Sequence, residues 1–238
     1  MALWAIGDFH LSFQVPEKSM DIFGKVWVNH EKKIVKHFNK LVKPEDTVVI
    51  TGDHTWGHRL DNCKEDMDFI KALPGRKILL RGNHDMFWNA KRTDRLNEMF
   101  NPDLYFLQNN YYTYKAKDGI CYALVGTKGY CYEGLDTIEH YEKIMKREVE
   151  RLQMSFDMAV ADGYKNFIMF LHYPPTSIGE QESLFTIMAE KYNVRDVIYS
   201  HCHGIDRFDD SFKGNVNGVE YWLVSGDYLK FKPVKIID

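Results

Sequence analysis

Residues 77–85 read Lys-Ile-Leu-Leu-Arg-Gly-Asn-His-Asp, a short apolar run followed at once by a turn of glycine and polar side chains. An apolar run of this length is typical of a β-strand that is buried on both faces. Few turns with a purely structural role need the series Gly82-Asn83-His84-Asp85. The stretch therefore predicts a strand whose carboxyl end carries chemically active groups.

The same arrangement recurs along the chain. Further apolar runs lie at 3–7, 47–51, 122–125, 166–171, 197–200 and 219–224, and most of them end in a polar turn. Between the runs, apolar residues follow the helical period of 3.6 residues at 34–42, 63–70, 141–159 and 184–188. Alternating strands and helices predict an α/β architecture, in which ligands bind at the carboxyl ends of the strands.

Three segments depart from this alternation. Residues 111–125, with Lys117-Asp118-Gly119 in the middle, are typical of a β-hairpin, and residues 208–221 of a second one. Residues 11–28 have no clear period and contain several aromatic residues. A long loop directly after a ligand-type turn is either a substrate-binding loop or a segment that packs its aromatic side chains over the domain edge. Both interpretations stay open.

Length and composition limit the class of protein. The chain has 238 residues, 45% of them hydrophobic and 27% charged, which excludes a disordered chain and fits one domain over residues 1–238. The formal net charge is -3, so nucleic acid is not the favoured partner. No apolar run is long enough to suggest a membrane span, and the amino terminus does not resemble a signal peptide.

The four cysteines contain no C-x-x-C pair. Reduced thiols in a cytoplasmic protein are the simplest interpretation, although a bridge between Cys121 and Cys131 stays open. The oligomeric state is also left open by the sequence.

Five predicted strand ends carry side chains that can bind metal ions. These seven donors are Asp8, His10, Asp53, Asn83, His172, His201 and His203. Because strand ends lie side by side in an α/β sheet, we expect the donors to converge. Seven oxygen and nitrogen donors are too many for one tetrahedral zinc ion and suit two adjacent ions that share a carboxylate. The mixture of carboxylate, imidazole and amide favours Mn²⁺, Fe²⁺ or Zn²⁺ over Ca²⁺ or Mg²⁺.

At this point the sequence resembles the calcineurin-like metallophosphoesterases. Those proteins carry D-x-H, G-D, G-N-H-D/E, a lone H and G-H-x-H in this order, and here the matched residues run from Asp8 to His203. The resemblance implies a four-layer sandwich of two β-sheets flanked by α-helices. It also implies a metal-dependent phosphoric ester hydrolase with a dinuclear centre at the strand ends.

The resemblance further implies a role for each matched residue. The ligands of the first metal would be Asp8, His10 and His203, and those of the second Asn83, His172 and His201. Asp53 would bridge the two metals, His84 would be the catalytic histidine near the leaving group, and Asp85 would orient His84. Two metals about 3.5–4 Å apart can hold a hydroxide that attacks phosphorus in line and can neutralise charge on the phosphoryl oxygens.

The sequence also departs from related families. Purple acid phosphatases have an iron-binding tyrosine where Trp56 stands, and calcineurin-type protein phosphatases continue G-D with an arginine that is missing after Asp53. These differences argue against purple acid phosphatase activity and against protein phosphatase activity. Ser200 stands where the last motif usually has glycine, which puts the geometry of that turn in doubt.

Substrate contacts are less well defined by the sequence. Arg81, Lys128 and His54 are candidates because they lie at or near strand ends on the expected ligand side. For each one, a structural or solvent-exposed role is the alternative. The pair Gly226-Asp227 after the last strand is interpreted as a turn.

We therefore expect hydrolysis of a small phosphodiester or phosphomonoester by a metal-bridging hydroxide. One alternative is a nuclease-type phosphodiesterase, which would need a positively charged groove at the metal face. The other is a non-catalytic binding scaffold, against which the complete set of matched residues argues.

Overall fold

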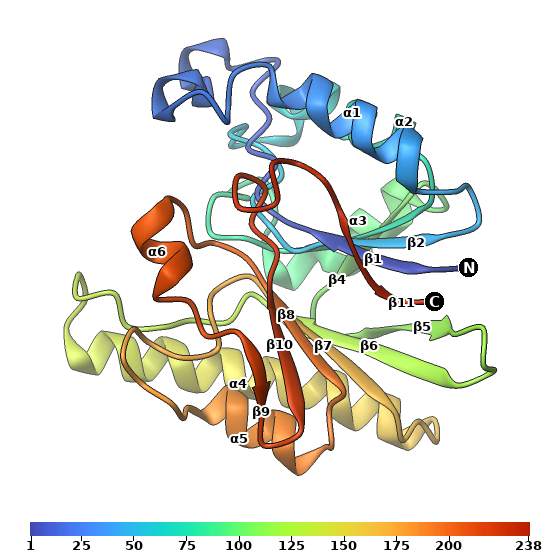
Figure 1. Ribbon diagram of the computed structural model, residues 1–238, viewed down its shortest axis with the longest axis vertical. Helices are drawn as coiled ribbons and strands as arrows, with labels where there is room; N and C mark the ends of the chain where they lie inside the picture. The colour runs from blue at the N-terminus through green and yellow to red at the C-terminus, as the bar shows by residue number, and fades with distance from the viewer.

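The computed structural model describes residues 1–238, and the amino-terminal part of the chain builds the first of two β-sheets (Figure 1). Its strands are β1 (Leu3–Ile6), β2 (Thr47–Ile50), β3 (Arg76–Leu80), β4 (Leu104–Leu107) and β11 (Val234–Ile237). The order is β11-β1-β2-β3-β4, with β1 to β4 parallel and β11 antiparallel to β1. The helices around this sheet are α1 (His30–Leu41), α2 (Lys64–Ala72) and α3 (Thr93–Phe100).

The second sheet follows in the chain. Its strands are β5 (Tyr111–Lys115), β6 (Cys121–Thr127), β7 (Phe167–Leu171), β8 (Asp196–Tyr199), β9 (Gly214–Val216) and β10 (Val219–Leu223). The order is β5-β6-β7-β8-β10-β9, with a parallel centre and antiparallel strands at both edges. The helices of this half are α4 (Ile138–Ala161), α5 (Leu184–Lys191) and the short α6 (Ile205–Asp209).

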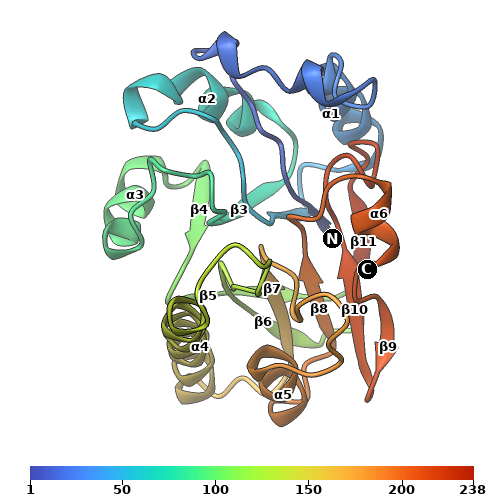
Figure 2. The same cartoon turned by 90° about the vertical axis from the view of Figure 1, so that its left-hand side faces the viewer.

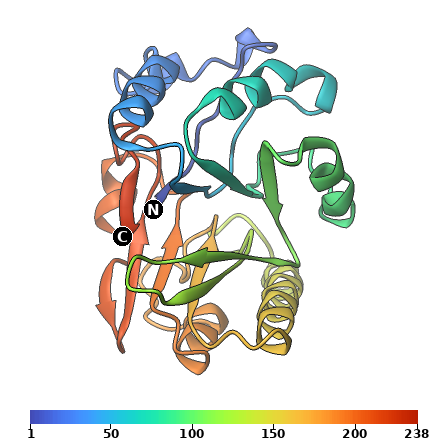
Figure 3. The same cartoon turned by 90° about the vertical axis from the view of Figure 1, so that its right-hand side faces the viewer.

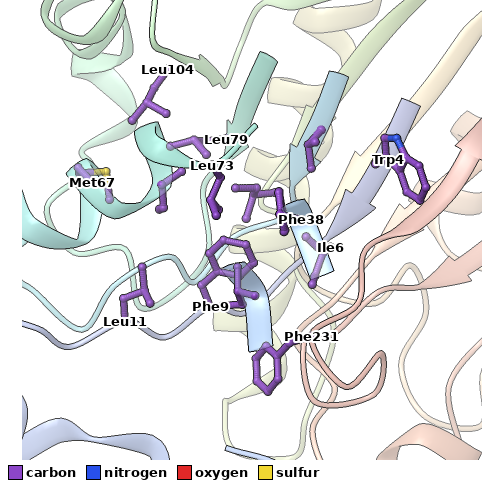
Figure 4. Packing of buried hydrophobic residues seen from close by; sticks show 14 of the residues in the cluster. Trp4, Ile6, Phe9, Leu11, Phe38, Met67, Leu73, Leu79, Leu104 and Phe231 are labelled. Atoms are coloured by element: carbon purple, nitrogen blue, oxygen red, sulfur yellow. The ribbon is translucent and has the colours of Figure 1, made fainter. Parts of the chain in front are cut away.

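Successive side chains of a strand point to opposite faces of its sheet, and this alternation creates the layers. In β1, Leu3 and Ala5 join a cluster of 15 buried residues drawn from both sheets. Trp4 and Ile6 point the other way, into 21 buried residues that the sheet shares with α1 and α2 (Figure 4). The second sheet has a corresponding cluster against α4 and α5. A strand with apolar residues on both faces is buried on both faces, which explains the uninterrupted apolar runs of the sequence.

Figures 2 and 3 show the resulting order of layers from two sides: helices, sheet, sheet, helices. The predicted α/β sandwich of two sheets flanked by helices is therefore confirmed. Each large apolar side chain that is fully buried between layers, such as Phe38 of α1, contributes roughly 2 kcal/mol to the free energy of unfolding.

Several elements differ from the sequence-based prediction. The pairing of β5 with β6 confirms the hairpin over 111–125. The second hairpin is shorter than predicted, because Phe208 lies in α6 and only β9 and β10 pair, through Asn217-Gly218. Neither α3 nor β4 was predicted; α3 is short and buries only Thr93 and Leu96.

The irregular segment 11–28 forms two single-turn 3₁₀ helices, η1 (Pro16–Lys18) and η2 (Met20–Phe23). Two further 3₁₀ turns, η3 (Leu60–Asn62) and η4 (Ala90–Arg92), occur elsewhere. Within the segment, Met20 and Trp27 are buried in the first core, whereas the side chain of Phe23 is 64% exposed. The segment thus packs part of its apolar surface and leaves another part open.

Two further expectations concern the chain as a whole. None of the helices combines the length and the apolar composition that crossing a bilayer requires. All four cysteines are free thiols, so Cys121 and Cys131 do not form a disulfide bond.

Candidate metal centre

The carboxyl ends of five parallel strands bring the predicted donors together. The donors form two groups of three side chains. Within each group, the ligand atoms lie within 4.8 Å of one another. The first group is Asp8, His10 and His203, and the second is Asp53, His172 and His201. Asn83 lies beside the second group, with its Oδ1 atom 2.7 Å from Nε2 of His172. All seven donors singled out in the sequence therefore lie in one region.

Asp53 lies between the two groups. Its Oδ2 atom is 3.6 Å from Nε2 of His10 in the first group and 3.4 Å from Nε2 of His172 in the second. Its Oδ1 atom accepts a hydrogen bond of 2.8 Å from the backbone N–H of His84. One carboxylate oxygen thus faces both groups, and the backbone of the next motif holds the other oxygen.

The backbone of this region is strained. Asp8, His10, Asp53 and His201 all have positive φ angles, between 44° and 70°. Residues other than glycine rarely adopt this backbone conformation. Those that do are concentrated at functional sites, where the surrounding structure enforces the conformation. The φ angles turn four donors out of the strand direction and toward the shared region.

Close packing of the turns explains a glycine of the third motif. A Cβ atom on Gly82 would lie 2.1 Å from Oδ1 of Asp53, closer than any non-bonded contact allows. The glycine therefore lets the third strand end approach the carboxylate of the second.

Two carboxylates orient the histidines of the H-x-H motif. Nδ1 of His203 lies 2.9 Å from Oδ1 of Asp227, and Nε2 of His201 lies 3.3 Å from Oε1 of Glu133. A carboxylate on one ring nitrogen fixes the tautomer and leaves the other nitrogen for a metal ion. Neither carboxylate was predicted from the sequence. The pair Gly226-Asp227 repeats the G-D motif after a strand, which was an available signal for Asp227, whereas nothing marked Glu133.

Ser200 makes a contact that the usual glycine cannot make. Its hydroxyl donates to the backbone carbonyl of Thr51 at 3.0 Å, and the same carbonyl lies 2.9 Å from Nδ1 of His172. With Nδ1 held there, the Nε2 atom of His172 faces Asp53 and Asn83. The substitution therefore leaves the ligand geometry intact.

Burial and neighbouring charges act on the two carboxylates in different ways. Burial raises the pKa of Asp8 to about 6, although His203 and His172 partly offset the shift. Burial also acts to raise the pKa of Asp53, but the neighbouring His172, His10 and His84 together outweigh it and hold this pKa well below its usual range. Asp53 is therefore an anion at neutral pH, and Asp8 is mostly one.

The imidazoles are also separated by their surroundings. Burial lowers the pKa of His201 to about 4 and that of His10 well below its usual range. Burial acts in the same direction on His203, but Asp8 and Asp227 outweigh it and raise its pKa to about 9. Nδ1 of His10 is buried and has no hydrogen-bond partner. Buried carboxylates beside neutral imidazoles with an unused nitrogen fit divalent cations that accept oxygen and nitrogen ligands.

His84 lies at the edge of the two groups and is half-buried. Its ring packs against Trp56, with a centroid distance of 4.3 Å, and against His10 at 5.6 Å. Burial lowers its pKa, and Asp53 partly offsets the effect. The ring lines an open cavity, so it is placed to contact a substrate.

Asp85 does not orient His84, which corrects the prediction. Its carboxylate accepts the backbone N–H groups of Asp53 and His54 at 2.9 Å and of Gly82 at 2.7 Å, and it also lies 2.9 Å from Nδ1 of His54. Asp85 thus joins the second and third strand ends. Its neighbour His84 points elsewhere because adjacent side chains diverge.

The same hydrogen bonds exclude His54 as a substrate contact. Its side chain is fully buried and is held by Asp85. The sequence-based prediction for His54 is therefore wrong, and this histidine supports the turn that carries Asp53.

Lys128 and Arg81 are placed differently from His54. The Nζ atom of Lys128 lies 4.6 Å from the ring centre of Tyr173 and 5.0 Å from that of Tyr130. Burial lowers the pKa of Lys128 to about 8. Tyr173 in turn packs on His201 with a centroid distance of 4.1 Å. The Nε atom of Arg81 is buried without a partner. Both cations thus keep unused hydrogen-bond donors, and Tyr173 places that of Lys128 close to the second group.

The order of the motifs and their convergence can now be compared with known proteins. Residues 1–204 match the family model described as calcineurin-like phosphoesterase. The chain belongs to the calcineurin-like phosphoesterase family. Membership of the calcineurin-like phosphoesterases makes the chain a hydrolase of phosphoric esters that depends on divalent metal ions. No curated protein matches the sequence itself.

Solved structures agree with the calcineurin-like phosphoesterase fold. A protein of unknown function, AQ665 from Aquifex aeolicus, is 20% identical with a TM-score of 0.50, and the alignment covers 98% of this chain and 95% of that one. Phosphopantetheinyl hydrolase PptH from Mycobacterium tuberculosis is 14% identical with a TM-score of 0.56, covering 99% and 95%. The calcineurin-like phosphoesterase YfkN from Bacillus subtilis is 17% identical with a TM-score of 0.52, covering 95% and 82%.

Proposed function

We propose that the protein hydrolyses a small phosphomonoester or phosphodiester with two divalent transition metal ions, Mn²⁺, Fe²⁺ or Zn²⁺. The observation that carries the proposal is the position of Asp53, whose Oδ2 atom lies within 3.6 Å of a histidine from each donor group. Asp8, His10 and His203 would hold one ion, and Asn83, His172 and His201 the other, with Asp53 shared. When bound, two such ions activate a water molecule as nucleophile and neutralise charge on the phosphoryl oxygens.

His84 is the proposed catalytic residue at the leaving group. Its backbone is anchored to Asp53, while its half-buried ring has no hydrogen bond within the protein and faces a cavity. A ring in this position can donate a proton or a hydrogen bond to the departing oxygen without serving as a metal ligand. The contact with Trp56 restricts the motion of the ring and holds it at the mouth of the site.

Lys128 and Arg81 are proposed to bind anionic oxygens of the substrate. Lys128 is 7% exposed and has no carboxylate within ion-pair distance, so its ammonium group is partly desolvated without being neutralised. A phosphoryl oxygen or a second anionic group of the substrate would supply the missing partner. The unused Nε of Arg81, which directly follows β3, adds a second donor.

The test combines metal content with a substrate screen. The purified protein is loaded separately with Mn²⁺, Fe²⁺, Zn²⁺ and Mg²⁺, its metal content is measured, and each sample is offered a panel of phosphate mono- and diesters. We expect close to two transition metal ions per chain and turnover of activated esters. A sample filled with metal that cleaves no member of the panel contradicts the proposal. Strongly salt-dependent binding of nucleic acid would instead favour the nuclease alternative.

We further propose that the protein works in the cytoplasm. All four cysteines are free thiols, and three of them are buried. Buried thiols without partners suit a reducing compartment. Titration of thiols in protein purified from its native cells without reductant should give four per unfolded chain, and a lower number contradicts this location.

A further inference from the structure

An apolar cavity adjoins the metal centre on the side of His84. Its volume is about 670 Å³, within the range of pockets that enclose small organic molecules. Three histidines of the site, His10, His84 and His203, form part of its lining. A ligand in this cavity would therefore contact the first donor group and the proposed leaving-group histidine at the same time.

The other walls of the cavity come from separate parts of the chain. The segment 11–28 supplies Met20, Phe23, Val26 and Trp27, and the region of α6 supplies Ile205 and Phe208. Trp56 adds a fourth aromatic side chain and touches both His10 and His84. Figure 1 shows that the segment before α1 and α6 lie on the same side of the molecule. The apolar lining is thus assembled across both halves of the fold.

Two residues at the cavity keep large apolar surfaces in water. The side chain of Phe23 is 64% exposed and that of Ile205 is 76% exposed. Neither position is needed for the core, and a pocket for a phosphate group alone would gain nothing from apolar side chains here. Exposed apolar surface that lines a cavity is typical of a site that buries an apolar ligand.

The charges around the cavity support the same conclusion. Asp227 is held by His203, which leaves Lys230 as the one charged side chain of the lining, apart from the histidines, that has no partner of opposite charge. By contrast, a second cavity of about 390 Å³ is lined by Arg207, Lys213, Asp210 and Glu180. The cavity beside His84 therefore offers few charged groups that could bind a strongly charged leaving group.

We propose that the substrate is the phosphate ester of a bulky apolar alcohol, whose apolar part occupies this cavity while its phosphate lies at the metal centre. The inference rests on the proposed function and adds the chemical class of the leaving group. Burial of the apolar part positions the ester oxygen beside His84. Because the apolar surface leaves water on binding, affinity rises with each methylene that is buried, by about fourfold at most.

The experiment compares esters that differ only in apolar size. Ethyl and hexyl phosphate have leaving groups of similar basicity, so a difference in kcat/KM reports binding of the chain. With the Mn²⁺-loaded protein we expect hexyl phosphate to exceed ethyl phosphate by at least about tenfold. Phenyl and 2-naphthyl phosphate form a second pair, and the pair with the larger ratio distinguishes an alkyl from an aromatic occupant. Ratios near one in both pairs overturn the inference, while turnover itself still supports the proposed function.

Variants locate the effect in the cavity. Phe23→Ser and Ile205→Ser should each reduce the hexyl-to-ethyl ratio by at least about threefold, since each removes apolar surface from the lining. Met158→Ser is the matched control, because Met158 is also exposed but lies on α4, away from the cavity. An unchanged ratio in both cavity variants overturns the inference.

A binding measurement covers the case in which none of these esters turns over. Ethylphosphonate and hexylphosphonate cannot be hydrolysed, and calorimetry with the metal-loaded protein gives their dissociation constants. We expect hexylphosphonate to bind at least about tenfold more tightly, with a loss of this preference in Phe23→Ser. Equal affinities overturn the inference whether or not the protein is active.

Discussion

The carboxylate of Asp227 lies 2.9 Å from Nδ1 of His203 and also 3.3 Å from the backbone N–H of Gly204. These contacts fix the His203 ring with Nε2 directed away from Asp227. Asp227 comes directly after Gly226 in the loop between β10 and β11. Residues near both ends of the chain therefore contribute to the site. We therefore expect Asp227 to influence metal affinity through His203.

Asp227→Asn should lower the affinity for the first metal ion by roughly 10- to 100-fold. The amide keeps the shape of the side chain but removes the charge that favours an Nδ1–H tautomer. Calorimetric titration of the metal-free protein measures the effect. The control is Asp209→Asn on α6, which removes an exposed carboxylate nearby. Equal metal affinity in the wild type and in Asp227→Asn would show that the contact has no such role.

Asp53→Asn should abolish metal-dependent activity. The substitution removes a carboxylate charge that faces a histidine of each donor group, so binding at both positions is weakened. Metal content measured by mass spectrometry should fall below that of the wild type. A variant that retains two ions and full turnover would contradict a shared ligand.

Asp85→Asn tests the corrected role of this residue. An amide nitrogen in place of an oxygen would face N–H donors, so the variant should lose roughly 3 kcal/mol of unfolding free energy in urea denaturation. Asp68→Asn on α2 is the control, since that carboxylate is exposed and only pairs with Lys71. A normal stability with a reduced kcat would favour the original prediction, in which Asp85 acts through His84.

The comparison of these residues shows what the sequence can and cannot predict. The donors at strand ends were predictable because carboxyl ends of parallel strands share one edge, whatever lies between them in the chain. Glu133 and Asp227 were not predicted, because their partners lie 68 and 24 residues away, and only Asp227 carries a local signal, its G-D pair after a strand. The direction of Asp85 depends on the turn that follows β3, which sequence adjacency to His84 does not determine.

The elements of the fold also divide into those with a local signal in the sequence and those without one. Strands that are buried on both faces gave clear apolar runs, so most strands of the two sheets were predictable, whereas β4 and β11 were not. The helix α3 was not predicted because it is short and buries only Thr93 and Leu96, which leaves few apolar positions to mark a helical period. The β11 strand pairs with β1 across nearly the full length of the chain, and such a contact leaves no local signal.

Asp46 provides a pH-dependent test of how the amino-terminal strand is held. Its carboxylate accepts the backbone N–H groups of Ala2 and Lys43 and the indole N–H of Trp4, at 2.7 to 3.1 Å. Burial acts against the charge, but these donors outweigh it and lower the pKa of Asp46. The stabilisation is therefore present at neutral pH and is lost as the pH falls below about 3.9. Asp46→Asn should unfold at lower urea concentration at pH 7, with a difference that shrinks toward pH 3. Glu45→Gln, at the exposed neighbouring position, should show neither effect.

His84→Asn separates catalysis from metal binding. Asparagine keeps the backbone contact to Asp53 but cannot transfer a proton, so kcat should fall by roughly 10²- to 10⁴-fold for esters with poor leaving groups. Esters of acidic alcohols need less help and should lose much less activity, because their oxygen departs without protonation. The metal content should stay at the wild-type level, since the ring of His84 belongs to neither donor group. Loss of metal from this variant would show that His84 is a ligand, and a uniform loss of activity across all leaving groups would show that it acts elsewhere in the reaction.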